Sequence, residues 1–367
     1  MNTTLKHATL ACTLLAATLA AGPSRAADKQ DNTVATESRS VAPFTAINIM
    51  GPFRVVITPQ GNTVELSGLR RQFADIETSV SGGTLTVRKP HQKNGWNINF
   101  NWGKDANPPM VIRIGAAGLK NLRNAGSGDV DLQQFQGQAL TITSDGSGDL
   151  TASGAVRELT VTASGSGDLN LRTLKAGNLQ LWMNGSGDVD AGGVTQDLNV
   201  RVNGSGDLDV GDVHGGRVNA ALHGSGSVRL QGTAQDIRAQ LHGSGDLDAC
   251  SLAVESATAQ LHGSGEACIA GNIKKLEAEV HSSGDLTVRG LQAQTVRAVL
   301  SGSGDMELSG STASISADIS GSGSLKGEQL SAGQTQISVH GSGNATVVDG
   351  KRLITYERKG TRERGAN

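Results

Sequence analysis

A Gly-Ser-Gly tripeptide recurs along this chain at a nearly constant step, with its first copies at Gly126, Gly146, Gly165 and Gly185. A fixed period of about 20 residues is typical of one short supersecondary unit that is stacked many times. The sequence therefore predicts an all-β fold, a single-stranded β-solenoid similar to a parallel β-helix, with Gly-Ser-Gly-Asp repeats at its corners. We expect structural corners at Gly126, Gly146, Gly165, Gly185, Gly204, Gly224, Gly243, Gly263, Gly302, Gly321 and Gly341, with a Ser-Ser-Gly variant that begins at Ser282.

Each unit carries two short stretches in which apolar and polar residues alternate strictly. Leu150-Thr151-Ala152 follows one corner, and Leu159, Val161 and Ala163 precede the next corner with polar residues between them. Alternation with a period of two predicts strands with one face in a core and the other in water. With 2% aromatic residues and 50 glycines, the composition suits thin stacked β-structure better than a mixed core.

The units come in two lengths that alternate and differ by a single residue, and they also differ in sequence beyond the first strand. The shorter units have glycine there, at Gly154, Gly193, Gly232, Gly271 and Gly310, and the longer units have Phe135, Leu174, Val213, Leu252, Leu291 and Leu330. If like residues stack on like, one full turn is a pair of unlike halves, about 39 residues in all. Six such turns would span about 29 Å at ~4.8 Å per turn. A turn of about 20 residues, which would make the array roughly twice as long, remains the alternative.

The rest of the chain divides by composition. Residues 1–26 have the basic start, apolar run and small-residue cleavage site of a signal peptide, which predicts export to the periplasm, the cell surface or the extracellular space. Residues 27–43 are expected to be a linker and 44–124 a β region that caps the solenoid. The repeat array covers 125–350, and 351–367 hold a final strand and a charged tail. We expect no transmembrane segment in the mature chain, and a net charge of −2 gives no reason to expect nucleic acid as a partner.

An acidic residue follows most corners. The aspartates are Asp129, Asp149, Asp168, Asp188, Asp207, Asp246, Asp285 and Asp305; Glu266, Ser227, Ser324 and Asn344 take the place in other units. Stacked carboxylates repel one another unless they are neutralised. We expect each to accept hydrogen bonds from the backbone amides of its own corner. Calcium between turns is the alternative, and otherwise no metal or cofactor is expected.

Histidine and cysteine offer two further patterns. His223, His242, His262, His281 and His340 precede a corner, where other units have Ser or Asn, so we interpret the position as a polar corner rather than a metal site. Cys250 and Cys268 are expected to face outward as incidental small residues without a disulfide framework.

Exposed aromatic side chains are the candidate ligand-binding residues. Trp96, Phe100 and Trp102 alternate with other residues in a loop-like stretch, and Trp182 occupies an outward strand position. Aromatic rings there could contact sugar rings or a partner surface. The sequence has no nucleophile elbow, paired-histidine motif or phosphate loop, so no catalytic residues are assigned and the chain is not expected to be an enzyme.

The repeats and the segments before them resemble the head GIN domain family of autotransporter adhesins. The likeness includes Phe44–Ile47, Gly51–Ile57 and Gly83–Val87 as well as the Gly-Ser-Gly-Asp-Leu/Val units, and covers about residues 40–350. It implies an exported β-solenoid with a surface or adhesion-type role. Our first hypothesis is a non-enzymatic, adhesin-like protein of the cell envelope that binds a glycan or an envelope protein through its flat faces and the stretch from Trp96 to Trp102. A structural or signalling component of the envelope, which binds through its cap or its cationic tail, is the alternative. A glycan-cleaving β-helix enzyme is a more distant one.

Overall fold

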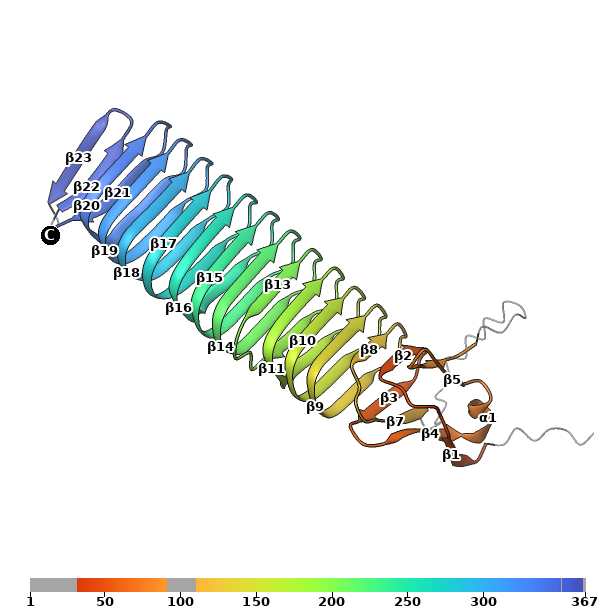
Figure 1. Cartoon of the computed structure of the whole chain (residues 1–367). Coiled ribbons are helices and arrows are strands. Elements are labelled where there is room, and N and C mark those ends of the chain that lie inside the picture. Colours follow the sequence, from red (N-terminus) through yellow and green to blue (C-terminus); the bar gives the residue numbers. More distant parts are fainter. Residues whose placement is uncertain (1–31, 91–109, 351, 366–367) are drawn as a thin grey trace, which may run out of the picture.

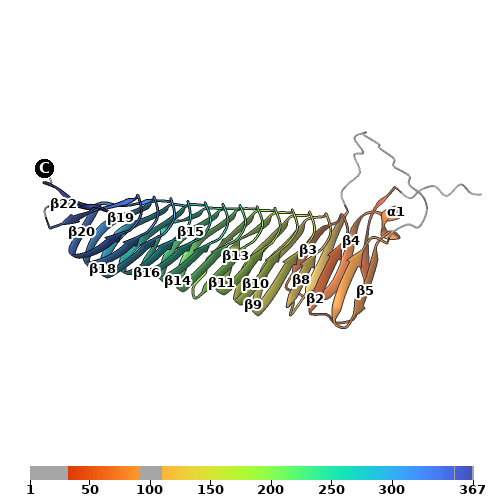
Figure 2. The ribbon, with the colours of Figure 1, turned by 90° about the horizontal axis from the view of Figure 1, so that it is seen from above.

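The computed structural model describes residues 32–90, 110–350 and 352–365. It shows a straight rod in which the turns of a β-solenoid are stacked on one another (Figure 1). The all-β solenoid predicted from the repeats is confirmed, with about 11 turns. Seen from above, the tips of the turns form one row along the rod (Figure 2). The repeat strands are β9 (Val130–Ser144), β10 (Leu150–Ala163), β11 (Leu169–Met183), β12 (Val189–Gly192), β13 (Leu198–Val202), β14 (Leu208–Leu222), β15 (Val228–Leu241), β16 (Leu247–Leu261), β17 (Ala267–Val280), β18 (Leu286–Leu300), β19 (Met306–Ile319) and β20 (Ser324–Val339).

Each Gly-Ser-Gly unit makes one complete turn of the solenoid, so the expected 39-residue turn is wrong. Leu150 pairs in parallel with Leu169, which pairs with Val189, which pairs with Leu208. Hydrogen bonds between neighbouring turns accordingly join positions that are 19 or 20 apart in the sequence. Every unit therefore lies directly above the one before it. At ~4.8 Å per turn, about 11 turns give a rod of roughly 50 Å rather than 29 Å.

The premise that like residues stack on like fails at the far bend of the turn. Gly154 lies between Phe135 of the previous turn and Leu174 of the next. A Cβ atom at Gly154 would overlap the carbonyl oxygen of Phe135, and its φ of +130° also favours glycine. A glycine likewise lies between two bulky residues where Gly232 pairs with Val213 and Leu252, and where Gly310 pairs with Leu291 and Leu330. Gly271 instead lies opposite Val254, and Ile273 lies opposite Leu291.

The extra residue of the longer turns lies beside this bulky position. Gln134 (φ +51°), Asp212 (φ +55°) and Gly290 (φ +77°) immediately precede Phe135, Val213 and Leu291. The ladder register shifts at the same places, for example between Ala152 and Gly154 opposite β9. The extra residue makes a β-bulge, which is left-handed at these three positions, and the ladder register also shifts beside Thr173, Ser251 and Gln329. One extra residue per bulge accounts for the alternation of longer and shorter turns.

The corner glycines are required because successive corners touch. A Cβ atom on Gly146 would overlap the carbonyl oxygen of Gly126, and one on Gly341 would overlap that of Gly321. The backbone N–H of the intervening serine donates to the turn before, as from Ser147 to Gly126 (3.1 Å). This contact holds the turns in register at the tip.

The core is a set of aliphatic columns enclosed by one continuous sheet, which folds back at the far bend so that its two halves face each other. We call these halves the outgoing sheet and the incoming sheet. We call the strand segment that follows a corner the outgoing strand and the one that precedes the next corner the incoming strand. Leu169, Leu171, Leu181 and Met183 of β11 are all at most 2% exposed, and their polar neighbours face water. The period-two strands predicted from the sequence are therefore confirmed, and each such aliphatic residue contributes ~1.5–3 kcal/mol by burial.

The N-terminal region ends both sheets with antiparallel pairs. Its elements are β1 (Val34–Arg39), β2 (Ala46–Met50), β3 (Arg54–Thr58), β4 (Asn62–Leu69), α1 (Arg70–Phe73), β5 (Glu77–Ser81), β6 (Thr84–Arg88), β7 (Val111–Ala116) and β8 (Asn121–Asn124). The outgoing sheet continues from β9 through β3, β7 and β4 to β1, and the incoming sheet through β8, β2 and β6 to β5. β1 lies within the stretch that we expected to be a linker.

The C-terminal end is less symmetric. The outgoing sheet continues from β20 into β21 (Asn344–Asp349), β22 (Arg352–Glu357) and β23 (Gly360–Gly365), the last two antiparallel. β23 occupies part of the stretch that we expected to be a charged tail. In the described part of the chain, no strand continues the incoming sheet beyond Gln334–Val339 of β20.

Candidate functional site: a carboxylate groove

A groove of about 710 Å³ runs across the outgoing strands of successive turns. Two columns of side chains border it: the residue after each corner, and the outward-facing residue two positions further on. Arg229 is the one basic residue of its lining. The acidic residues of the lining are Asp149, Asp168, Asp188, Asp190, Asp207, Asp209, Asp246 and Asp248. This excess of carboxylates makes the groove strongly negative.

The first column is fixed by hydrogen bonds between turns. The backbone N–H of Asp168 donates to Oδ1 of Asp149 (2.9 Å), that of Asp188 to Asp168 (2.9 Å) and that of Asp207 to Asp188 (2.8 Å). We expected donors from the same corner, but the donors belong to the next turn, because the short turn places the next amide directly above each carboxylate. Oδ2 has no part in these bonds.

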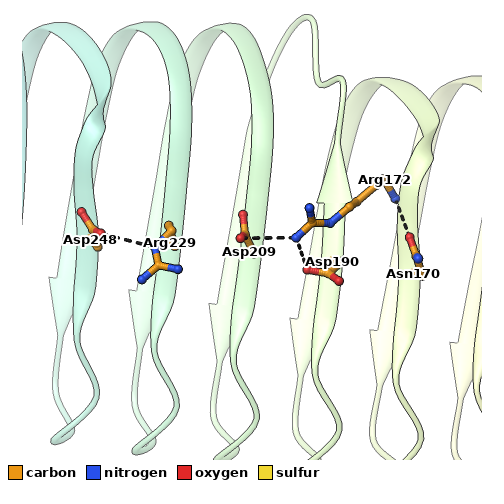
Figure 3. Close-up of polar contacts among 6 residues, drawn as sticks. All are labelled: Asn170, Arg172, Asp190, Asp209, Arg229 and Asp248. Carbon is orange, nitrogen blue, oxygen red and sulfur yellow. Dashed lines mark hydrogen bonds and ion pairs between the residues drawn. The ribbon is translucent and has the colours of Figure 1, made fainter.

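The second column carries ion pairs along the rod (Figure 3). Nη2 of Arg172 lies 2.8 Å from Oδ1 of Asp190 and 3.5 Å from Oδ2 of Asp209, and Nε of Arg229 lies 3.4 Å from Oδ2 of Asp248. The hydrogen bond and the charge of Asp190 raise the pKa of the Arg172 guanidinium. Because these side chains are largely exposed, each ion pair stabilises the fold little. The aspartate of a pair can therefore exchange its arginine for another cation.

The groove can attract cationic groups because carboxylates dominate its lining. Neither histidine nor cysteine lines it. No group of three or more His, Cys, Asp or Glu side chains within residues 32–90, 110–350 and 352–365 is arranged to hold a metal ion. An ammonium or guanidinium ligand is the species that two columns of partly free carboxylates accept best.

Four histidines form a continuous stack at the corner. The ring centroids of His223, His242, His262 and His281 are separated by 4.9, 5.0 and 5.0 Å, with nearly parallel planes. Burial, followed by the charges of Arg201 and His242, lowers the pKa of His223. Burial and both neighbouring histidines also lower the pKa of His262, against an opposing effect of Glu279. A 39-residue turn would have divided this stack between two edges.

The last histidine of the stack contacts a serine without forming a catalytic triad. Nδ1 of His281 lies 2.7 Å from Oγ of Ser301, whereas Nε2 lies 3.7 Å from the Glu279 carboxylate, beyond hydrogen-bond distance. The histidine side chain is 36% exposed. A serine nucleophile needs a hydrogen-bonded base that is itself oriented by a third group, and this arrangement lacks that orientation.

Cys250 and Cys268 form a disulfide, so our interpretation of them as incidental residues is wrong. Their Cα atoms are 5.2 Å apart, and the bond joins β16 to β17. The two cysteines meet because their separation along the chain is close to one turn, and Cys268 lies opposite Asp248. Disulfides of this kind persist in oxidising compartments outside the cytoplasm.

Of the aromatic candidates, the structure describes Trp182 alone. Trp182 is 37% exposed and lies between Thr162 and Arg201 on the incoming sheet, away from the groove. Trp96, Phe100 and Trp102 lie outside the described residues.

Sequence reasoning missed the second column of the groove. Its members recur once per turn, and that regular spacing was the available signal; they are Asn170, Asp190, Asp209, Arg229 and Asp248. With a 39-residue turn, neighbours in this column are assigned to opposite sides, so the groove does not appear.

Short stacked turns, glycine corners and a carboxylate groove define a β-solenoid repeat protein with an extended polar face. The chain belongs to the family described as "Putative auto-transporter adhesin, head GIN domain", whose model matches residues 43–210, 193–290 and 268–355. The resemblance inferred from the sequence is thus confirmed. The family description indicates an adhesin-like or binding role and an exported or surface protein.

Several solved structures are similar to this chain. A "putative adhesin" from Bacteroides fragilis NCTC 9343 is 18% identical, covering 86% of this chain and 97% of its own, with a TM-score of 0.27. Another from Parabacteroides distasonis ATCC 8503 is 16% identical, covering 84% and 98%, with a TM-score of 0.36. A "putative lipid binding protein" from the same species is 17% identical, covering 87% and 98%, with a TM-score of 0.32. TM-scores this low add nothing to the family match.

No curated protein matches the chain. Within the described residues, no helix has the length and apolar character needed to cross a membrane.

Proposed function

We propose that this is an exported, non-enzymatic, adhesin-like protein of the cell envelope whose carboxylate groove binds a linear glycan that carries amino groups. The groove is the observation that supports this proposal. It extends over the turns from Asp149 to Asp248, and the carboxylates of its columns repeat once per turn. The disulfide and the signal-like residues 1–26 support export.

The spacing of the columns favours a glycan over a peptide. Side chains on one face of an extended peptide recur at ~6.6 Å, which does not match a step of ~4.8 Å between turns. One hexose unit of a linear polysaccharide is close to one turn in length. In a β-1,4-linked chain such as chitosan, alternate units face the same side, so the amino groups on one face could meet the carboxylates of every second turn. A basic segment of an envelope protein is the competing partner. Trp182, on the incoming sheet, offers a separate surface for stacking a sugar ring.

Calorimetric titration of the mature protein with chitosan oligosaccharides tests the proposal. We expect the double variant Asp190→Asn, Asp209→Asn to bind about 10-fold or more weakly, because it removes two ionic contacts of up to ~1 kcal/mol each. Glu255→Gln removes an exposed carboxylate from the far bend and serves as the matched control. Fully N-acetylated oligosaccharides should bind far less.

Three results contradict the proposal. Equal affinity for the aminated and acetylated sugars would show that charge is not recognised. Unchanged binding by the double variant would place the site elsewhere. Binding of an oligolysine peptide without any binding of the glycan would identify an envelope protein as the partner class.

A further inference from the structure

The incoming sheet ends at an open strand edge. Residues Gln334–Val339 of β20 pair with β19 on one side, from Ser314 opposite Gln334 to Ile319 opposite Val339. β21 pairs only with the earlier part of β20, up to Ala332. No strand in residues 352–365 pairs with Gln334–Val339 either, since β22 and β23 extend the other sheet.

The backbone groups at this edge point outward. In an earlier turn, the N–H of Leu179 donates to the carbonyl oxygen of Asp197 in the turn that follows (3.0 Å). Thr335 occupies the column of Leu179, and Ile337 and Val339 follow it at the period of two. Their N–H and C=O groups therefore face away from β19, toward a position that no described strand fills.

The core is also open at this edge. Ile315, Ala317 and Ile319 of β19 are 1%, 4% and 1% exposed, whereas Thr335, Ile337 and Val339 one turn later are only half-buried. Tyr356 of β22 covers part of the opening, with its hydroxyl 2.8 Å from Oγ1 of Thr335. An added strand would complete burial of this column.

The edge lacks the protection that the other terminal strands have. β1 carries Glu37 and Arg39, β5 carries Glu77, and β23 carries Arg362, whereas Gln334–Val339 contains no charge and no proline. Charges on edge strands prevent unwanted pairing between molecules. An uncharged edge over an open core is the arrangement that accepts another strand.

The chain contains one segment whose sequence complements this edge. Residues 96–102, which lie outside the described residues, read Trp-Asn-Ile-Asn-Phe-Asn-Trp. Apolar residues alternate with asparagines, as Thr335, Ile337 and Val339 alternate with Gln334, Gln336 and Ser338. A strand of this sequence would place aromatic and aliphatic groups over the open core and amides beside amides.

Residues 96–102 cannot reach the edge of their own molecule. They are joined to β6 and β7 at the opposite end of the rod (Figure 1). The chain from Arg88 to Trp96 spans at most ~29 Å when extended, against a rod of roughly 50 Å. The strand must come from a second copy.

We propose that residues 96–102 of one copy add as a strand to Gln334–Val339 of another copy, so that the rods join head to tail. Each copy has one donor segment and one open edge at opposite ends. A contact between two different surfaces does not close on itself in a straight rod, so the product is a linear filament.

Sedimentation velocity of the mature chain over a concentration series tests this proposal. We expect the wild type to form a ladder of oligomers. Ile337→Pro keeps an apolar side chain but removes the outward N–H, and it should abolish assembly; Ile337→Val keeps that N–H and is the matched control. Phe100→Lys places a charge in the donor segment, outside the described rod, and should abolish assembly as well.

Mixing the two inactive variants provides the sharpest test. Ile337→Pro has an intact donor and Phe100→Lys an intact edge, so the mixture should form 1:1 complexes and nothing longer. A wild type that remains monomeric at its highest soluble concentration overturns the proposal. So does assembly that persists in Phe100→Lys, which would indicate pairing of two open edges, and so does a mixture that remains monomeric.

Discussion

The histidine stack makes the solenoid sensitive to mild acid. The ring centroids of neighbouring histidines in the stack are 4.9–5.0 Å apart, so positive charges on neighbouring rings repel each other; the stack consists of His223, His242, His262 and His281. The folded state lowers the pKa of His223 and His262, so the unfolded chain binds protons more readily. The contribution of these two histidines to the free energy of unfolding is therefore fully present above their unfolded pKa of about 6.5. It is lost as the pH falls from there through their lower pKa values in the folded state.

The magnitude follows from the ring spacing. Two unit charges about 5 Å apart repel by about 0.8 kcal/mol in water, and physiological salt reduces this by roughly half. With three adjacent pairs, full protonation costs about 1 kcal/mol, which lowers the melting temperature by roughly 2 °C for a chain of this size. Arg201 adds to the repulsion at one end of the stack, and Glu279 opposes it at the other.

Thermal unfolding between pH 8 and pH 5 measures the effect. The native column has Asn184 and Asn203 in the preceding turns, so His242→Asn with His262→Asn is a substitution that the fold already accommodates. This variant should lose less stability on acidification, and the difference should shrink in high salt. Equal acid sensitivity of wild type and variant at low salt would refute the reasoning.

Three further predictions concern contacts between turns. Gly224→Ala should destabilise the protein by more than about 2 kcal/mol in denaturant unfolding, because its Cβ would overlap the carbonyl oxygen of Gly204, whereas Gly211→Ala, with open space around it, should be near neutral. Reduction of the Cys250–Cys268 disulfide should cost about 3 kcal/mol in the same assay, and a double alanine variant should no longer respond to reductant. Asp188→Ala should destabilise by about 1 kcal/mol through loss of the acceptor for the next turn, while Asp188→Asn should retain most of that stability, as differential scanning calorimetry can show.

The sequence was sufficient to predict the strands and the corners of a single turn. The alternation in Leu159, Val161 and Ala163 identified the inward face, and the glycine tripeptides identified the corners. Both signals are local, since a strand shows its two faces and a tight corner excludes side chains wherever it lies. They establish the fold class without establishing which residues lie above one another.

Which residues of neighbouring turns lie in contact depends on the number of residues per turn. The incorrect prediction of 39 residues per turn therefore led to three incorrect predictions of contacts between turns. The far bend stacks Phe135, Gly154 and Leu174, so volume is complementary between turns rather than repeated within each column. The assumption that like residues stack on like predicted that Cys250 and Cys268 lie apart and that the histidines lie on two different edges. It also left the second column of the groove unrecognised. The sequence alone could not choose between the longer and the shorter turn, because complementary and identical stacking both produce the same alternation of residue types.

The two ends of the solenoid differ in how their last strands are covered. Identical turns have no intrinsic end, so a rod ends only where a different element covers its last strand. At the N-terminal end, the antiparallel pairs β1–β4 and β5–β6 end both sheets and carry charged edges. At the C-terminal end, β22 and β23 end one sheet, and Gln334–Val339 leaves the other ready for another strand. Among the described residues this unprotected edge lies at one end of the rod only, so a strand supplied by the opposite end of a second copy would join the rods in one direction.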